Sequence, residues 1–338
     1  MSEHDEAVET NRQDSTTDTP TRIAIACQGG GSHTAFTAGV LRTLLDEWGD
    51  DYELVGISGT SGGAFNALGT WYGLVTGDAE RARTILDGLW TDLAADGVQD
   101  RWMNSLVTTL SRMESAGFPL PSISPYQVLG PEVGKQRIRE VLERHIDFDA
   151  IPDLCDRQVP EFVVGTVDIN AGVFETFINE EVTVDAVLAS AAVPNLFEAV
   201  EIHGHLHWDG LFSQNPPVRE LMWLPPDRKP EELWIIQINS QEFEGEPETL
   251  DVIADRRNEL SGNISLNQEL GFIERINGWV EDGTLPADKF QQTSIHRIQM
   301  GKRFHCSTKV DRDPAFLDEL RTLGNQRARE FLESRADS

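Results

Sequence analysis

Cysteine is scarce in this sequence of 338 residues, and what little there is forms no pattern. The three cysteines, Cys27, Cys155 and Cys306, are odd in number and far apart, without C-x-x-C spacing. Such a distribution argues against a disulfide framework and against a thiolate metal site. A reducing compartment, the cytoplasm, is therefore the expected environment.

Positive charge is also scarce. The chain has five lysines, and its formal net charge is −29 at pH 7. An acidic surface of this kind is typical of halophilic proteins, because concentrated salt screens self-repulsion within a few ångströms. An ordinary acidic protein is the alternative. No basic stripe is present to neutralise phosphates, so nucleic acid is not an expected partner.

Long apolar runs are absent as well. No stretch of about 18 apolar residues is found, so no membrane-spanning helix is predicted. Residues 1–20 are acidic and rich in Ser and Thr, a composition that predicts a disordered N-terminal tail. They lack the features of a signal peptide. The 39% hydrophobic content suffices for one large α/β core. We expect a single domain over residues 21–338.

The clearest motif is Gly59-Thr60-Ser61-Gly62-Gly63. It follows a short apolar run, Leu54–Ile57, expected to be a strand, and it precedes a helical run of small residues. G-x-S-x-G between a strand and a helix is typical of a nucleophile elbow, which makes Ser61 the candidate nucleophile. Such turns also occur for packing alone, so the motif needs a second feature to support it.

A second glycine-rich turn, Gly29-Gly30-Gly31, lies between a strand expected at Arg22–Cys27 and the next helix. Bare backbone N–H groups beside a helix N-terminus can hold an anion. The G-K-[ST] ending of a phosphate loop is missing, and so is an intact G-x-G-x-x-G. The remaining candidate is the oxyanion of a tetrahedral acyl intermediate.

With a third motif, the sequence resembles the patatin-like phospholipase family over residues 22–218. This motif comprises residues 189–194, Ala-Ser-Ala-Ala-Val-Pro, followed by Asp209-Gly210 and then by Asn215-Pro216-Pro217. The resemblance implies a three-layer α/β/α fold with a central, mostly parallel sheet. It also implies a Ser61–Asp209 dyad and hydrolysis of a lipid ester without metal or cofactor.

The resemblance also implies roles for the glycines. The oxyanion hole would be formed by Gly29, Gly30 and Gly31, and the motifs would be supported by Gly59, Gly62, Gly63 and Gly210. Two positions depart from the family pattern. His33 replaces the usual basic residue, which would make the local charge titratable. Leu211 replaces a glycine, which puts the shape of the Asp209 turn in question.

The sequence leaves alternatives to the dyad and to a phospholipase. An α/β-hydrolase triad would need a histidine after Asp209, either His296 or His305, but in that fold several strands normally precede the elbow. We therefore favour the dyad. A lipid-binding protein that has lost turnover is the non-enzymatic alternative. Among enzymes, a depolymerase of intracellular polyhydroxyalkanoate is the runner-up, and contact with membranes or storage granules would be peripheral. No oligomeric state is predicted.

Three further segments carry open interpretations. Residues 98–123 form an amphipathic stretch that could be a lid contacting lipid or a helix packed on the core. His203, His205 and His207 alternate beside Asp209, but Gly204 is expected to form a hairpin turn and no fourth metal ligand is evident. We expect these histidines to be structural or solvent-facing. Residues 230–336 should add strands and helices to the same domain.

Overall fold

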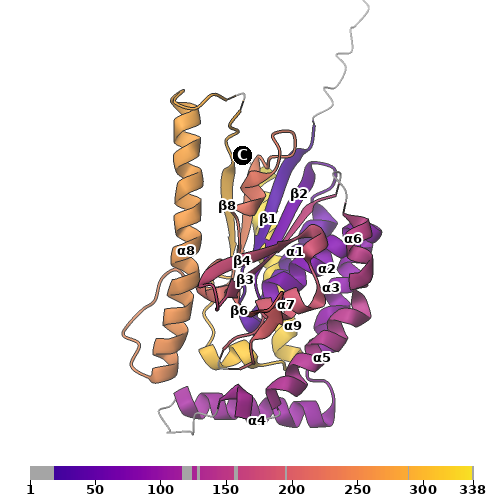
Figure 1. The fold of residues 1–338 in the computed structure, drawn as a ribbon, viewed down its shortest axis with the longest axis vertical. Coiled ribbons are helices and arrows are strands. Elements are labelled where there is room, and N and C mark those ends of the chain that lie inside the picture. The colour runs from indigo at the N-terminus through magenta and orange to yellow at the C-terminus, as the bar shows by residue number, and fades with distance from the viewer. Residues whose placement is uncertain are drawn as a thin grey trace, which may run out of the picture.

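The computed structural model describes residues 19–115, 124–127, 130–155, 159–194, 196–287 and 289–336. The predicted tail over residues 1–20 lies almost wholly outside these ranges, and so does the end of the amphipathic stretch, residues 116–123. In the part that is described, the expected α/β architecture is confirmed: helices flank a mixed, mostly parallel sheet (Figure 1).

The central strands are continuous apolar runs because they are buried on both faces, as is usual for parallel strands covered by helices. The sheet order is β5-β6-β3-β2-β1-β7-β8, with β4 paired to β3. β1, β2, β3, β7 and β8 are parallel, whereas β4 and β6 pair with β3 antiparallel and β5 pairs with β6 antiparallel. The strands are β1 (Thr21–Cys27), β2 (Tyr52–Gly59), β3 (Glu161–Asp168), β4 (Val173–Ile178), β5 (Val200–Ile202), β6 (His205–Asp209), β7 (Glu232–Gln237) and β8 (Ser294–Gln299).

Alternate residues of β1 face two separate cores. Ile23, Ile25 and Cys27 belong to a large core shared with most of the helices, whereas Ala24 and Ala26 belong to a smaller core under α8. The helices are α1 (Ala35–Glu47), α2 (Gly62–Thr76), α3 (Ala79–Leu93), α4 (Val98–Ser115), α5 (Gly130–His145), α6 (Ile151–Leu154), α7 (Val184–Ser190), α8 (Leu250–Glu281) and α9 (Pro314–Ala336). Figure 1 shows α8 alone on one side of the sheet and α1, α2 and α3 on the other.

Two short 3-10 segments pack against each other between the glycine loop and α4. The first, η1 (Gly31–Thr34), follows β1, and the second, η7 (Cys306–Val310), lies against both η1 and α4. α4 therefore lies beyond the ends of the strands, at the bottom of Figure 1. None of the helices within the described ranges is long and apolar enough to cross a bilayer.

Candidate active site

The topology brings Ser61 and Asp209 together because two strands meet end to end along one edge of β3. β2 pairs in parallel with the first half of this edge and β6 pairs antiparallel with its second half, while β4 occupies the opposite edge. The last residue of β2, Gly59, is opposite Val164, and the last residue of β6, Asp209, is opposite Thr166. The elbow and the Asp209 turn therefore converge over Gly165.

Ser61 adopts the strained backbone of an elbow, with φ 57° and ψ −132°. A residue with a Cβ atom rarely adopts positive φ, and such strain persists only where the surrounding structure enforces it. α2 begins directly after this turn, and Ser61 is buried, with only 7% of its surface exposed. The positive end of the α2 dipole is therefore directed at the nucleophile.

The segment before β5, residues 189–194, holds both catalytic candidates. Ser190 Oγ accepts a hydrogen bond from the Ser61 N–H at 2.9 Å and donates one to the Gly165 carbonyl at 2.7 Å. The Ala192 carbonyl accepts from the Asp209 N–H at 3.1 Å. Sequence reasoning quoted this segment only as a family motif and missed that Ser190 positions the elbow.

Asp209 is fully buried. Its Oδ1 atom accepts a hydrogen bond from the Leu211 N–H at 2.9 Å, and its Oδ2 atom has no hydrogen-bond partner of normal geometry among the described residues. Burial raises the pKa of Asp209 to about 7, although the Leu211 N–H and the nearby Ser61 hydroxyl oppose this shift. A carboxylate with raised basicity beside a serine hydroxyl can accept its proton.

Hydrogen bonds also join the end of β2 to the chain that follows Asp209. The Ser58 hydroxyl donates to the Pro217 carbonyl at 2.5 Å, and the Thr60 hydroxyl donates to the Gln214 carbonyl at 2.7 Å. All four residues are buried or nearly so. These contacts fix the distance between the elbow and the Asp209 turn.

The glycine loop lies against the elbow. A Cβ atom on Gly29 would lie 2.6 Å from the Thr60 carbonyl oxygen and 2.9 Å from Ser61 Cβ, so only glycine fits there. The Gly29 N–H donates to Asn215 Oδ1 at 2.6 Å and is therefore not available to an oxyanion. Of the three glycines predicted to form the oxyanion hole, only Gly30 and Gly31 remain candidates. The N–H groups of Gly30 and Gly31 have no partner among the described residues.

A buried amide network, which sequence reasoning did not detect, supports this loop. Gln28 Nε2 donates to the Asn215 carbonyl at 3.2 Å and to Asn263 Oδ1 at 3.0 Å. Gln28 Oε1 accepts from the backbone N–H groups of Ile238 and Asn239. Because these partners come from distant parts of the chain, no local sequence pattern could have revealed the network.

The remaining predicted glycines are explained by close backbone approaches. A Cβ atom on Gly63 would lie 2.3 Å from the Cys27 carbonyl oxygen, and one on Gly210 would lie 2.7 Å from the Gly165 carbonyl oxygen. Gly59 and Gly62 have similarly short approaches, to the backbone of α2 and to the Thr34 hydroxyl respectively. All four therefore permit the elbow, β1 and the Asp209 turn to pack closely.

The two departures from the family pattern have clear outcomes. The expected titratable charge at His33 is wrong: burial and the nearby Lys309 lower the pKa of His33 to about 3, so the ring is neutral. Its Nε2 atom is 2.7 Å from the Thr308 hydroxyl. Leu211 does not have positive φ, so glycine is not required at this position. Its N–H donates to Asp209 Oδ1, and the Asp209 turn therefore forms without the second glycine.

Neither histidine of the alternative triad hydrogen-bonds to Ser61 or Asp209. His296 lies 3.0 Å from an Arg335 guanidinium nitrogen and 3.7 Å from a Glu232 oxygen. His305 is 2.8 Å from the Ser307 hydroxyl and caps η7. Their places in the fold do not support a Ser-Asp-His triad.

The histidines before Asp209 lie partly as expected. His203 and Gly204 have positive φ and form the hairpin turn between β5 and β6. His207 is buried rather than solvent-facing, and the structure brings Asp168 and Glu175 to it from two other strands. The additional ligand-type residues that were not evident in the sequence are therefore present.

A family model described as patatin-like phospholipase matches residues 25–222. No curated protein gives a match. Among solved structures, VipD from Legionella pneumophila is 14% identical, with coverage of 94% of this chain and 67% of its own and a TM-score of 0.44.

The type III effector ExoU is 15% identical, with coverage of 94% of this chain and 53% of its own and a TM-score of 0.36. ExoU in its complex with SpcU, from Pseudomonas aeruginosa, is 14% identical, with coverage of 95% and 52% and a TM-score of 0.38. This chain thus spans about half the length of these ExoU chains. Because the family model covers more than half of the sequence, the chain belongs to the patatin-like phospholipase family.

Proposed function

We propose that this protein hydrolyses carboxylic esters of lipids through a Ser61–Asp209 dyad. The observation that carries the proposal is the buried Asp209 carboxyl group beside the strained Ser61 elbow, whose Oδ2 atom has no hydrogen-bond partner among the residues that the structure describes. An unpaired buried polar atom costs folding free energy, so its retention beside a nucleophile argues for use in chemistry.

The arrangement supports a two-step acyl transfer. Asp209 accepts the Ser61 hydroxyl proton as Oγ attacks the ester carbonyl, and the N–H groups of Gly30 and Gly31 stabilise the oxyanion. The tetrahedral intermediate collapses to an acyl-serine when the leaving alcohol takes the proton from Asp209. Water then attacks the acyl-serine with Asp209 as base, and the fatty acid and the free serine are released.

The α4 helix supports a lipid surface as the substrate form, because its polarity is inverted. Its inward positions are polar: Asn104 hydrogen-bonds to Asp311 and to the Arg312 N–H at 2.8 Å each. Its apolar side chains face solvent, with Trp102 66% and Met103 49% exposed. The other exposed apolar residues of α4 are Leu106, Val107, Leu110 and Met113.

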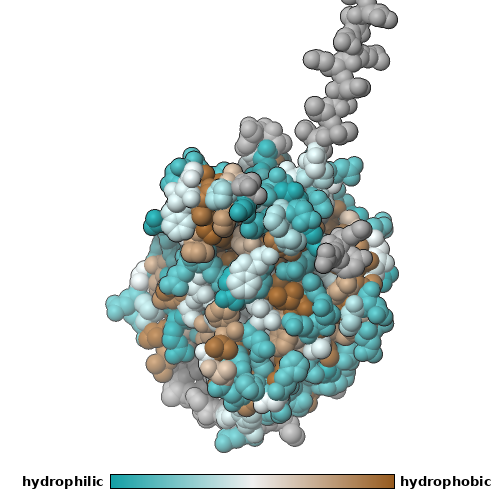
Figure 2. Space-filling model, turned by 45° about the horizontal axis from the view of Figure 1, so that its top comes forward, coloured by the Kyte–Doolittle hydropathy of each residue, from teal (hydrophilic) through white to brown (hydrophobic). Residues whose placement is uncertain are grey.

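This apolar face of α4 lies at the same end of the molecule as the site, because α4 contacts η7 and η7 in turn contacts η1, which begins in the glycine loop. The face seen in Figure 2 differs, because small apolar patches there are dispersed among hydrophilic residues. A contiguous apolar helix face next to an ester-hydrolysing site is suited to insertion into a lipid interface. For α4, the described part of residues 98–123, the interpretation as a lid contacting lipid is therefore favoured.

The dyad is tested with a p-nitrophenyl acyl ester and a fluorophosphonate probe followed by peptide mapping. We expect the probe on Ser61, and we expect Ser61→Ala and Asp209→Asn each to abolish hydrolysis, with the double variant no worse than either single variant. Retained activity in Asp209→Asn, together with loss in His296→Ala or His305→Ala, would show that the dyad is wrong. No turnover by the wild type would favour the catalytically silent lipid-binding protein.

The substrate class is tested by assaying phospholipid vesicles and native polyhydroxyalkanoate granules side by side across a salt series. We expect fatty acid release from vesicles, reduced in Trp102→Glu and unchanged in Glu201→Gln, an exposed position on β5. Release of hydroxyacids from granules, with vesicles untouched at every salt concentration, would replace the phospholipase by the polyester depolymerase.

A further inference from the structure

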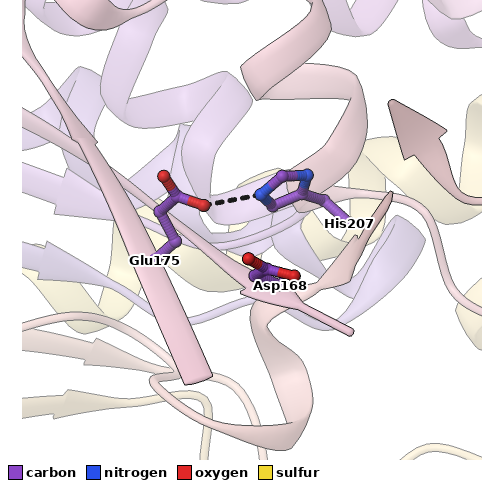
Figure 3. Close-up of side chains that lie close together, drawn as sticks. All are labelled: Asp168, Glu175 and His207. Carbon is purple, nitrogen blue, oxygen red and sulfur yellow. Dashed lines mark hydrogen bonds and ion pairs between the residues drawn. The ribbon is translucent and has the colours of Figure 1, made fainter. Parts of the chain in front are cut away.

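A second cluster of chemically active side chains lies beside the dyad and takes no part in the proposed hydrolysis. Asp168, Glu175 and His207 each offer one ligand-type atom, and these atoms all lie within 4.8 Å of one another (Figure 3). The three residues come from β3, β4 and β6 respectively. Asp168 is opposite His207 in the β3–β6 register, so the two side chains share one face of the sheet.

Glu175 reaches the same face from the other edge of β3. Its partner in the β3–β4 register is Thr166, two residues before Asp168. Because side chains two residues apart on a strand share a face, Thr166 and Asp168 point the same way and Glu175 points with them. Antiparallel pairing of three strands thus gathers residues that are far apart in sequence.

The hydrogen bonding of His207 leaves its Nε2 atom directed at Glu175, where it could bind a metal ion. Its Nδ1 atom is 3.1 Å from the His205 carbonyl oxygen, an acceptor that fixes the proton on Nδ1. The other ring nitrogen, Nε2, lies only 2.6 Å from Glu175 Oε2. A carboxylate oxygen and a ring nitrogen can be this close only when a cation, either a proton or a metal ion, lies between them. Metal-bound histidines characteristically donate their other N–H to a backbone carbonyl in this way.

Asp168 is also held in place before any ligand arrives. Its Oδ1 atom accepts hydrogen bonds from the N–H groups of Asn170 at 2.8 Å and Ala171 at 2.9 Å. Its Oδ2 atom is 2.5 Å from His205 Nδ1. The Asp168 side chain is only 6% exposed, whereas that of Glu175 is 38% exposed. The cluster therefore has two fixed ligands and one that can adjust.

We propose that Asp168, Glu175 and His207 form a site for a divalent transition-metal ion, with zinc the best match. Two carboxylates and one neutral imidazole balance a divalent charge, and the mixed nitrogen and oxygen donors suit zinc better than calcium or magnesium. A tetrahedral zinc ion would separate Nε2 and the Glu175 oxygen by about 3.3 Å. The exposed Glu175 side chain can open the present contact by this small amount. Water would complete the coordination.

Such an ion would join β3, β4 and β6 through one atom. β6 ends at Asp209, two residues after His207, so the ion would help to fix the strand that carries the proposed catalytic base. The ion is a structural element here and takes no step in hydrolysis. The alternative is a protonated His207 paired directly with Glu175.

The full-length protein is first stripped with a chelator and then titrated with zinc in concentrated salt, with stoichiometry measured by elemental analysis and stability by thermal unfolding. We expect one tightly bound zinc ion, a higher unfolding midpoint, and visible d–d absorption when cobalt(II) replaces zinc. Glu175→Gln keeps the size of the side chain and should weaken zinc binding on the order of tenfold or more. Asp168→Asn should do the same.

Glu201→Gln is the matched control, because it removes an equal charge from an exposed position on the neighbouring β5. It should bind zinc like the wild type. Equal zinc uptake by the wild type and Glu175→Gln would overturn the proposal, since it would show that zinc binds elsewhere on the acidic surface. Failure of the stripped wild type to bind zinc would also overturn it and would leave the His207–Glu175 ion pair as the explanation.

Discussion

Asp209 should make the protein less stable as the pH rises, and replacing it with asparagine should remove this dependence. In the folded protein, burial raises the pKa of Asp209 from 3.8 to about 7. A raised folded-state pKa means that the folded state binds more protons than the unfolded state between these two values. The resulting stability is fully present below pH 4 and is lost as the pH rises through 7.

The size of this effect follows from the shift. Each pH unit between the two pKa values changes the free energy of unfolding by about 1.4 kcal/mol. Between pH 5 and pH 8, wild type should therefore lose about 3 kcal/mol relative to Asp209→Asn. Asparagine can still accept the Leu211 N–H bond, and any constant cost of its amide cancels when the two pH values are compared.

The assay is urea unfolding of both proteins at pH 5, 6, 7 and 8 in the same salt. We expect the free energy of unfolding of Asp209→Asn to gain steadily on that of wild type up to pH 7 and then to level off. Asp318→Asn, which removes an exposed carboxylate on α9, controls for the loss of one charge. A difference between wild type and Asp209→Asn that stays constant within about 1 kcal/mol would refute the raised basicity of Asp209.

Three further predictions concern catalysis. Because Ser61 attack requires ionised Asp209, kcat/KM should rise as the pH rises through about 7 and reach a plateau, and a profile falling over this range would contradict the role of Asp209 as base. Gly30→Ala places a Cβ atom 2.7 Å from Ile238 Cγ2, so it should displace the loop amides and lower kcat on the order of a hundredfold. Partial recovery in Gly30→Ala with Ile238→Ala would show that the clash was the cause. Ser190→Ala removes the hydrogen bonds that Ser190 makes to the Ser61 N–H and the Gly165 carbonyl, so it should slow fluorophosphonate labelling of Ser61 on the order of tenfold with KM nearly unchanged. A higher KM with unchanged labelling would instead place Ser190 in substrate binding.

Much of the fold could be predicted because its signals are local. The strands expected at Arg22–Cys27 and Leu54–Ile57 are short apolar runs, and they lie within β1 and β2. The glycine motifs could be located for a related reason: a close approach between strand and helix excludes a side chain whatever the rest of the fold does.

The rest could not be predicted because it depends on partners distant in sequence. His33 occupies the position of a basic residue, yet the aromatic rings of Phe304 and Phe316 surround it and keep it neutral. Likewise, the alternation of His205 and His207 is visible in sequence, but Asp168 and Glu175 reach them only through antiparallel pairing. Register between strands decides which side chains meet, and a single sequence does not specify it.

Three features that weaken folding gather at one end of the sheet. Ser61 has a strained backbone, Asp209 is a buried carboxyl group with one oxygen unpaired within the described part of the chain, and α4 buries Asn104 while exposing Trp102. Each departs from what packing and solvation favour, and such departures concentrate at functional sites. In β7, by contrast, all six residues are buried. At the proposed site each departure has a use: strain presents the nucleophile, desolvation raises the basicity of its partner, and the exposed apolar helix face is stabilised only when it meets another apolar surface.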